Sequence, residues 1–138
     1  EITSKCFGTL AMIHNEARNE QILTNSILIR KGDKVPTFVT ESFFTMRDNQ
    51  NAVTCRVTES AAPETDPAFV KIIWEGDLEL PSGRAAGQEI KITYTYNSNQ
   101  IMRCSFVDAA TEKKTEIEIS MTQTSPEGES KIDQFLVE

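Results

Sequence analysis

The chain has 138 residues, which suits one domain, and 38% of them are hydrophobic, which is enough to form a core. Its 14 lysines and arginines against 21 aspartates and glutamates give a formal charge of −7. This balance argues against a nucleic-acid partner and against docking on anionic lipid. No apolar run approaches the roughly 20 residues that span a bilayer, so no membrane partner is expected.

Apolar and polar residues alternate with a period of two through most of the chain, which is typical of half-buried β-strands. The clearest case is Ile90, Ile92 and Tyr94, which are separated by a lysine and a threonine. Turn-forming residues at 48–51 and 97–100 separate such runs. The pattern predicts eight strands, near residues 6–13, 22–30, 38–47, 51–59, 69–75, 88–97, 100–107 and 115–121.

Short strands at this spacing predict an all-β fold, an antiparallel eight-stranded β-sandwich. After the last strand the pattern changes, because Ile132, Phe135 and Leu136 follow one another at helical spacing. We therefore expect a β-sandwich domain over residues 1–121. Residues 122–138 are expected to form a short C-terminal helical segment or a flexible tail.

Side chains suited to catalysis are few. The single histidine, His14, lies in a polar stretch and is interpreted as a solvated loop residue. Cys6, Cys55 and Cys104 lie within strand patterns, where cysteine is more often a small buried hydrophobe than a nucleophile. Three widely spaced cysteines predict neither a disulfide framework nor a zinc site. We expect no catalytic residue, no metal, no enzymatic activity and a cytoplasmic location.

Two stretches carry a more specific pattern. The first runs from Gly-Asp-Lys-Val-Pro-Thr at 32–37 to Asp-Asn-Gln-Asn-Ala-Val-Thr at 48–54. The second is the alternating run 90–96, followed by Asn-Gln-Ile-Met at 99–102. In order and spacing, these stretches resemble the peptide-binding β domain of the seventy-kilodalton, DnaK-like heat-shock chaperones.

The resemblance covers roughly residues 3–120 and implies that residues 1–121 are a substrate-binding domain, in which a short extended peptide lies between two loops of the sandwich. It also implies that residues 122–138 are the start of a helical lid. It implies a molecular chaperone that binds extended hydrophobic segments of unfolded proteins during protein folding and the stress response. The family's ATPase domain is expected upstream of Glu1, so ATP is expected only there and no cofactor within this chain. The implied partners are unfolded polypeptide segments, that ATPase domain and co-chaperones.

Carried over residue by residue, the resemblance also implies a peptide-binding site. Its pocket would be lined by Thr9, Phe43, Val53 and Cys55, and Met12 and Met46 would arch over the bound chain. Backbone-contacting or neighbouring positions would be Leu10, Ala11, Phe44, Gln50 and Ala52.

Several residues depart from the family's pattern. The stretch 12–21 is longer and more polar than the family's tight turn, and Phe44 replaces a small polar residue and could fill the channel. Gln100 replaces the usual turn glycine, where a positive φ is favoured. The alternative function is therefore a scaffold or regulatory interaction module that has lost peptide capture. The tail also predicts self-association, with Phe135 and Leu136 entering a neighbour's cleft.

Overall fold

The structure is a computed structural model that describes residues 1–121. It contains eight strands and one short 3-10 helix: β1 (Cys6–Asn15), β2 (Glu20–Ile29), β3 (Thr37–Phe44), β4 (Ala52–Ser60), η1 (Pro67–Phe69), β5 (Lys71–Glu79), β6 (Glu89–Tyr96), β7 (Ile101–Asp108) and β8 (Lys114–Ser120). The predicted C-terminal helical segment, its boundary and the tail residues proposed for self-association lie outside the described residues.

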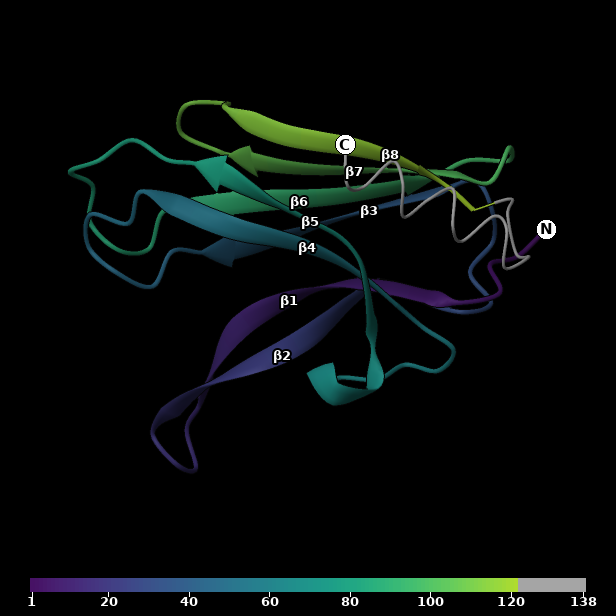
Figure 1. The fold of residues 1–138 in the computed structure, drawn as a ribbon, viewed down its shortest axis with the longest axis horizontal. Helices are drawn as coiled ribbons and strands as arrows, with labels where there is room; N and C mark the ends of the chain where they lie inside the picture. Colours follow the sequence, from purple (N-terminus) through teal and green to yellow (C-terminus); the bar gives the residue numbers. More distant parts are fainter. Residues whose placement is uncertain (122–138) are drawn as a thin grey trace.

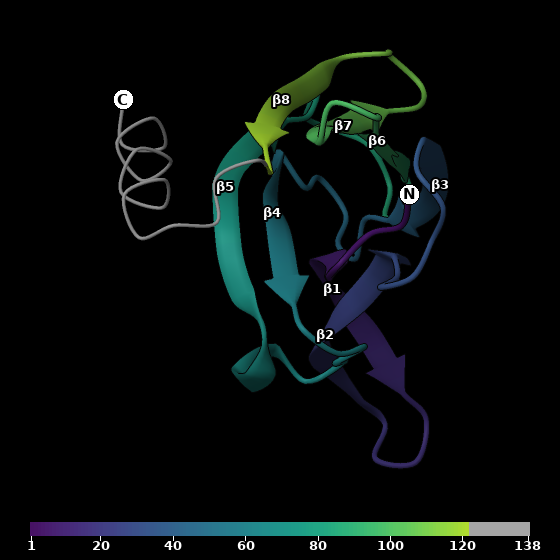
Figure 2. The same ribbon diagram turned by 90° about the vertical axis from the view of Figure 1, so that its right-hand side faces the viewer.

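The strands form two antiparallel sheets, in the orders β2-β1-β4-β5 and β3-β6-β7-β8 (Figure 1). The two sheets face each other, with β5 beside β8 on one side and β2 beside β3 on the other (Figure 2). The predicted all-β, eight-stranded sandwich is therefore confirmed. Within residues 1–121, no helix has the length and apolar character that crossing a membrane would require.

The first hairpin is longer than the sequence pattern predicts. The stretch 14–20 was expected to be a loop, but β1 continues to Asn15 and β2 begins at Glu20. Its ladder includes the opposed pairs Ile13–Ile22 and His14–Gln21. The hairpin projects from the sandwich, so both of its faces meet water and its side chains need not alternate (Figures 1 and 2). His14 is exposed, as expected, but lies on a strand.

The core lies between the sheets and is formed by the inward side chains of the alternating strands. Phe106 is fully buried near its centre, where it stacks on Trp74 with ring centroids 5.9 Å apart and meets the ring of Tyr94 edge-on at 6.3 Å. Offset and edge-to-face geometries are the favourable ones for aromatic pairs. These three rings join β5 to β6 and β7 across the sandwich.

Buried hydrogen bonds fix β1 where it begins to leave β4. The two strands pair only from Cys6–Ser60 to Gly8–Thr58. Just beyond that point, the Tyr94 hydroxyl donates to the Gly8 carbonyl at 2.6 Å, and the Thr9 hydroxyl donates to the Arg56 carbonyl at 2.8 Å. Both acceptors are backbone carbonyls at the end of the β1–β4 ladder. They also anchor the point from which the two strands diverge.

Candidate functional site

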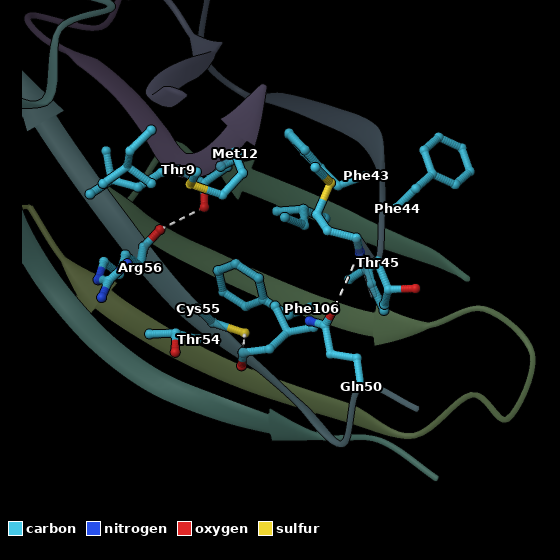
Figure 3. A pocket seen from close by; sticks show the side chains of 17 residues that line it. Thr9, Met12, Phe43, Phe44, Thr45, Gln50, Thr54, Cys55, Arg56 and Phe106 are labelled. Carbon is cyan, nitrogen blue, oxygen red and sulfur yellow. Dashed lines mark hydrogen bonds between the residues drawn. The ribbon is translucent and has the colours of Figure 1, made fainter. Parts of the chain in front are cut away.

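A cavity opens where β1 and β4 diverge. On one side, β4 pairs with β5 from Ala52 through Val57 before the ladder shifts register at a bulge. On the other side its ladder with β1 ends at Thr58. The space left between β1 and the first half of β4 is a cavity of about 270 Å³ (Figure 3).

Four segments build this cavity. One wall is the second half of β1, with Leu23 of β2, and the other is the first half of β4. The end of β3 and the loop that follows it close a third side. The floor comes from the opposite sheet, through Ile90 and Ile92 of β6 and Phe106 of β7. All three floor residues are buried, so the bottom of the cavity is apolar.

Ten of the eleven predicted site residues line this cavity. They are Thr9, Leu10, Ala11, Met12, Phe43, Phe44, Met46, Gln50, Val53 and Cys55. Ala52 does not; it lines a separate, shallower hollow with Asp77, Glu79 and Lys113. Ala52 is the first residue of β4 and lies opposite Glu79 of β5, which also lines this hollow.

The rim of the cavity carries flexible apolar side chains. Met12, on β1, and Met46, in the loop after β3, are both partly exposed while lining the cavity. Methionine has three rotatable bonds and a polarisable sulfur, so it adapts to surfaces of different shape. Phe44 was considered able to fill the channel, but it is 57% exposed and its ring points away from the cavity (Figure 3). The cavity is therefore not closed by its own aromatic ring.

The loop between β3 and β4 is closed by one side chain. The Gln50 carboxamide accepts a hydrogen bond from the Met46 amide at 3.1 Å and donates to the Ala52 carbonyl at 3.0 Å. Asn49 has a φ of 58°, a left-handed conformation that asparagine tolerates better than most residues. The Gln50 side chain thus links Met46 to Ala52 within the loop. The Ala52 carbonyl therefore helps to hold the loop at the rim of the cavity.

Seven residues of the cavity were not predicted: Leu23, Thr45, Thr54, Arg56, Ile90, Ile92 and Phe106. The alternation of Ile90 and Ile92 marked them as inward-facing, but no sequence signal places their strand beneath β1 and β4. Leu23 lies opposite Met12 in the hairpin, which only the strand register reveals.

Cys55 lies at the inner part of the cavity and is 1% exposed. Burial, and next the nearby charge of Asp77, raise the pKa of its thiol to about 12. The thiol donates weakly to the Val53 carbonyl, with sulfur and oxygen 3.7 Å apart. Because the thiolate is the reactive species, this group is a poor nucleophile. It contributes apolar lining rather than chemistry.

We expect Cys55 to resist alkylation in the native chain. At pH 8 a thiol with a pKa of about 12 is ionised in only about one molecule in 10,000, so its reaction with iodoacetamide should be at least about 1,000-fold slower than that of an exposed cysteine. Peptide mapping by mass spectrometry would measure this, with the chain unfolded in guanidinium as the control. Rapid labelling of Cys55 in the folded chain would contradict the buried, neutral thiol.

Among known protein families, the family model described as Hsp70 protein matches residues 20–138. The matched region begins at the first residue of β2 and contains β3 and β4, which supply Phe43, Val53 and Cys55 to the cavity. It also contains the strands of the cavity floor.

Proposed function

The chain belongs to the Hsp70 family, and from this premise we propose that the cavity between β1 and β4 binds short, extended, apolar segments of unfolded polypeptide. Membership supports a chaperone-type function. The observation that carries the finer proposal is an apolar-floored cavity placed directly beside an unpaired stretch of strand edge.

The backbone of a bound segment would pair with the diverging strands. From Ala52 to Val57, before its ladder with β1 begins at Thr58, the edge of β4 that faces β1 has no strand partner among residues 1–121. An extended peptide can add to such an edge through main-chain hydrogen bonds. Each of these bonds contributes about 0.5–1.5 kcal/mol net, and none depends on the identity of the peptide's side chains. This contact favours extended segments of any sequence.

One apolar side chain of the bound segment would enter the cavity. Burying a leucine-sized side chain contributes about 1.5–3 kcal/mol. Together with several main-chain bonds, and after the cost of ordering the peptide, this supports a free energy of binding near −8 kcal/mol, which corresponds to a dissociation constant of about 1 μM. Weak binding with low sequence selectivity suits a protein that holds many different unfolded chains.

We propose a binding role without catalysis. The buried, un-ionised thiol of Cys55 supports this, because Cys55 is the cysteine that lines the cavity. The outward ring of Phe44 supports peptide capture over the alternative, a scaffold module whose cleft has closed. An upstream ATPase domain, co-chaperones and a cytoplasmic location belong to the same proposal.

Titration of the chain against a fluorescein-labelled, leucine-rich heptapeptide tests the proposal. We expect fluorescence anisotropy to report saturable binding with a dissociation constant of about 1 μM. A matched peptide with aspartate in place of each leucine should bind at least about tenfold more weakly, because it offers nothing to the apolar floor. Absence of binding by chain that circular dichroism shows to be folded would overturn the proposal.

A further inference from the structure

The rim loop, residues 45–51, is held from outside by the loop at 81–88 between β5 and β6. At its first end, the Thr45 amide donates to the Gln88 carbonyl at 3.0 Å, and the Thr45 carbonyl accepts from the Gly87 amide at 2.9 Å. The Thr45 hydroxyl accepts a further bond from the Gln88 amide at 2.9 Å. Three hydrogen bonds therefore hold Thr45 in place, directly before Met46 at the rim of the cavity.

The far end of the rim loop is fixed in the same way. The Asn49 amide donates to the Arg84 carbonyl at 2.7 Å, and the Asn49 side chain accepts from the Gly83 amide at 2.5 Å. The Asp48 carboxylate accepts from the Ala86 amide at 2.9 Å. The position of the rim loop is therefore only as well defined as the position of the supporting loop 81–88.

One side chain anchors the supporting loop to the sandwich. Arg84, whose carbonyl receives the Asn49 amide, directs its guanidinium to Asp108 at the end of β7. The Nη1 atom donates to Oδ1 at 3.2 Å, and Nη2 lies 3.1 Å from Oδ2 as an ion pair without hydrogen-bond geometry. Asp108 is fully buried and the Arg84 side chain is only 20% exposed. One hydrogen bond and one close ion contact therefore join the two side chains.

The pair is charged, although it is buried. Burial would raise the pKa of Asp108, but hydrogen bonds from Thr111 and Arg84, and the guanidinium charge, outweigh it and hold the pKa below its usual value. The carboxylate accepts from the Thr111 hydroxyl at 2.7 Å. Asp108 is thus a fixed acceptor, held by β7 on one side and by the turn after it on the other.

A contribution to stability alone does not explain the Arg84–Asp108 pair. The Nε and Nη2 atoms of Arg84 are buried without a hydrogen-bond partner among residues 1–121, which is costly. Replacing a buried ion pair by apolar residues of similar volume is often neutral or stabilising. An apolar pair of similar size would not hold one point of the supporting loop through a directional hydrogen bond. The pair is therefore better explained by what it positions.

We propose that Arg84 is a positioning residue for the peptide cleft. Its anchor on Asp108 holds the supporting loop, and through Asn49 this holds the rim loop with Met46 and Gln50. This inference rests on the proposed function and assigns a role to a residue that does not line the cavity. Without the anchor, the rim loop would open more often and a bound peptide would leave faster.

The test compares Arg84→Met, which keeps the length of the side chain but removes its charge and donors, with two controls. Arg103→Gln removes an exposed arginine of the same strand as Asp108, where it pairs with Glu118 on the outer face. Ile119→Val trims the core on β8, which lowers stability without touching either loop. If Arg84→Met folds poorly, Asp108→Asn is tested instead, because it removes the other charge of the Arg84–Asp108 ion pair.

Stopped-flow release of the labelled heptapeptide is the first measurement. For Arg84→Met and Asp108→Asn we expect dissociation to become about tenfold faster while association changes less than about twofold. Arg103→Gln and Ile119→Val should leave both rates within about twofold of the original chain. Equal dissociation rates in Arg84→Met and Ile119→Val would assign Arg84 a role in stability alone and overturn the inference.

Hydrogen exchange in the peptide-free chain separates this inference from the proposed function. We expect Arg84→Met to lower the protection of the Thr45 and Asn49 amides at least about tenfold, while core amides of β7 follow global stability as in Ile119→Val. If no chain binds peptide, the proposed function fails but this measurement still tests the anchor. Unchanged protection of Asn49 would overturn the anchor even if peptide binding is confirmed.

Discussion

Val53→Phe is expected to weaken peptide binding about 100-fold or more. Val53 lines the cavity beside Cys55, and a phenyl ring at this position would occupy the space into which the peptide's side chain enters. Loss of that burial removes about 1.5–3 kcal/mol of binding free energy, and displacement of the peptide backbone adds to it. The heptapeptide titration measures the change, and chemical denaturation shows that the variant is folded.

A matched control lies one residue earlier in the same strand. Ala52→Phe introduces the same ring, but Ala52 lines the shallow hollow with Asp77 and Glu79 on the other side of β4. We expect this variant to bind the heptapeptide within about threefold of the original chain, because the ring meets solvent rather than the cavity. Equal loss of binding in both variants would mean that the cavity does not receive the peptide side chain.

Gly8→Ala is expected to destabilise the domain by about 3 kcal/mol or more, near the upper limit for a small insertion into a packed interior. A Cβ atom on Gly8 would lie 2.3 Å from the Ser26 carbonyl oxygen and 3.1 Å from its carbon. These are backbone atoms of the neighbouring strand, so β1 and β2 would have to separate. The Gly8 carbonyl also accepts a hydrogen bond from the Tyr94 hydroxyl, and the same movement would strain that bond.

Urea denaturation followed by Trp74 fluorescence would measure this loss, because Trp74 is stacked on the buried ring of Phe106. Gly32→Ala is the control: no atom lies within 4 Å of its added Cβ, although its φ of +95° imposes about 1 kcal/mol of strain. The order of stability should be original chain, Gly32→Ala, Gly8→Ala. A Gly8→Ala variant as stable as the control would show that β1 and β2 separate at little cost.

Alternation alone was sufficient to predict the fold. The strands that face the core on one side only, such as the one containing Ile90 and Ile92, have the clearest pattern and bounds within about a residue of the prediction. The first hairpin did not follow, because its part from Ile13 to Ile22 projects into solvent, where no buried face imposes a period. The turn at Gln100 has the positive φ, 60°, that its family position favours.

The candidate site was predictable only in part, for a geometric reason. Residues on β1, β3 and β4 were identified through the resemblance, and the cavity brings ten of them together. Ala52, expected as a backbone-contacting or neighbouring position, does not line the cavity, but its carbonyl accepts from the Gln50 side chain at the rim. The floor residues and Arg84 were missed because their contribution depends on how the two sheets are placed, and on one buried partner, Asp108, 24 positions away.

The cavity is assembled from residues that lie far apart in the chain, from Thr9 on β1 to Phe106 on β7. A nascent copy on the ribosome therefore has no cleft until nearly the whole domain has been synthesised, because the floor is among the last parts to emerge. Until then its own apolar strands are unfolded segments of the kind that the finished domain is proposed to hold.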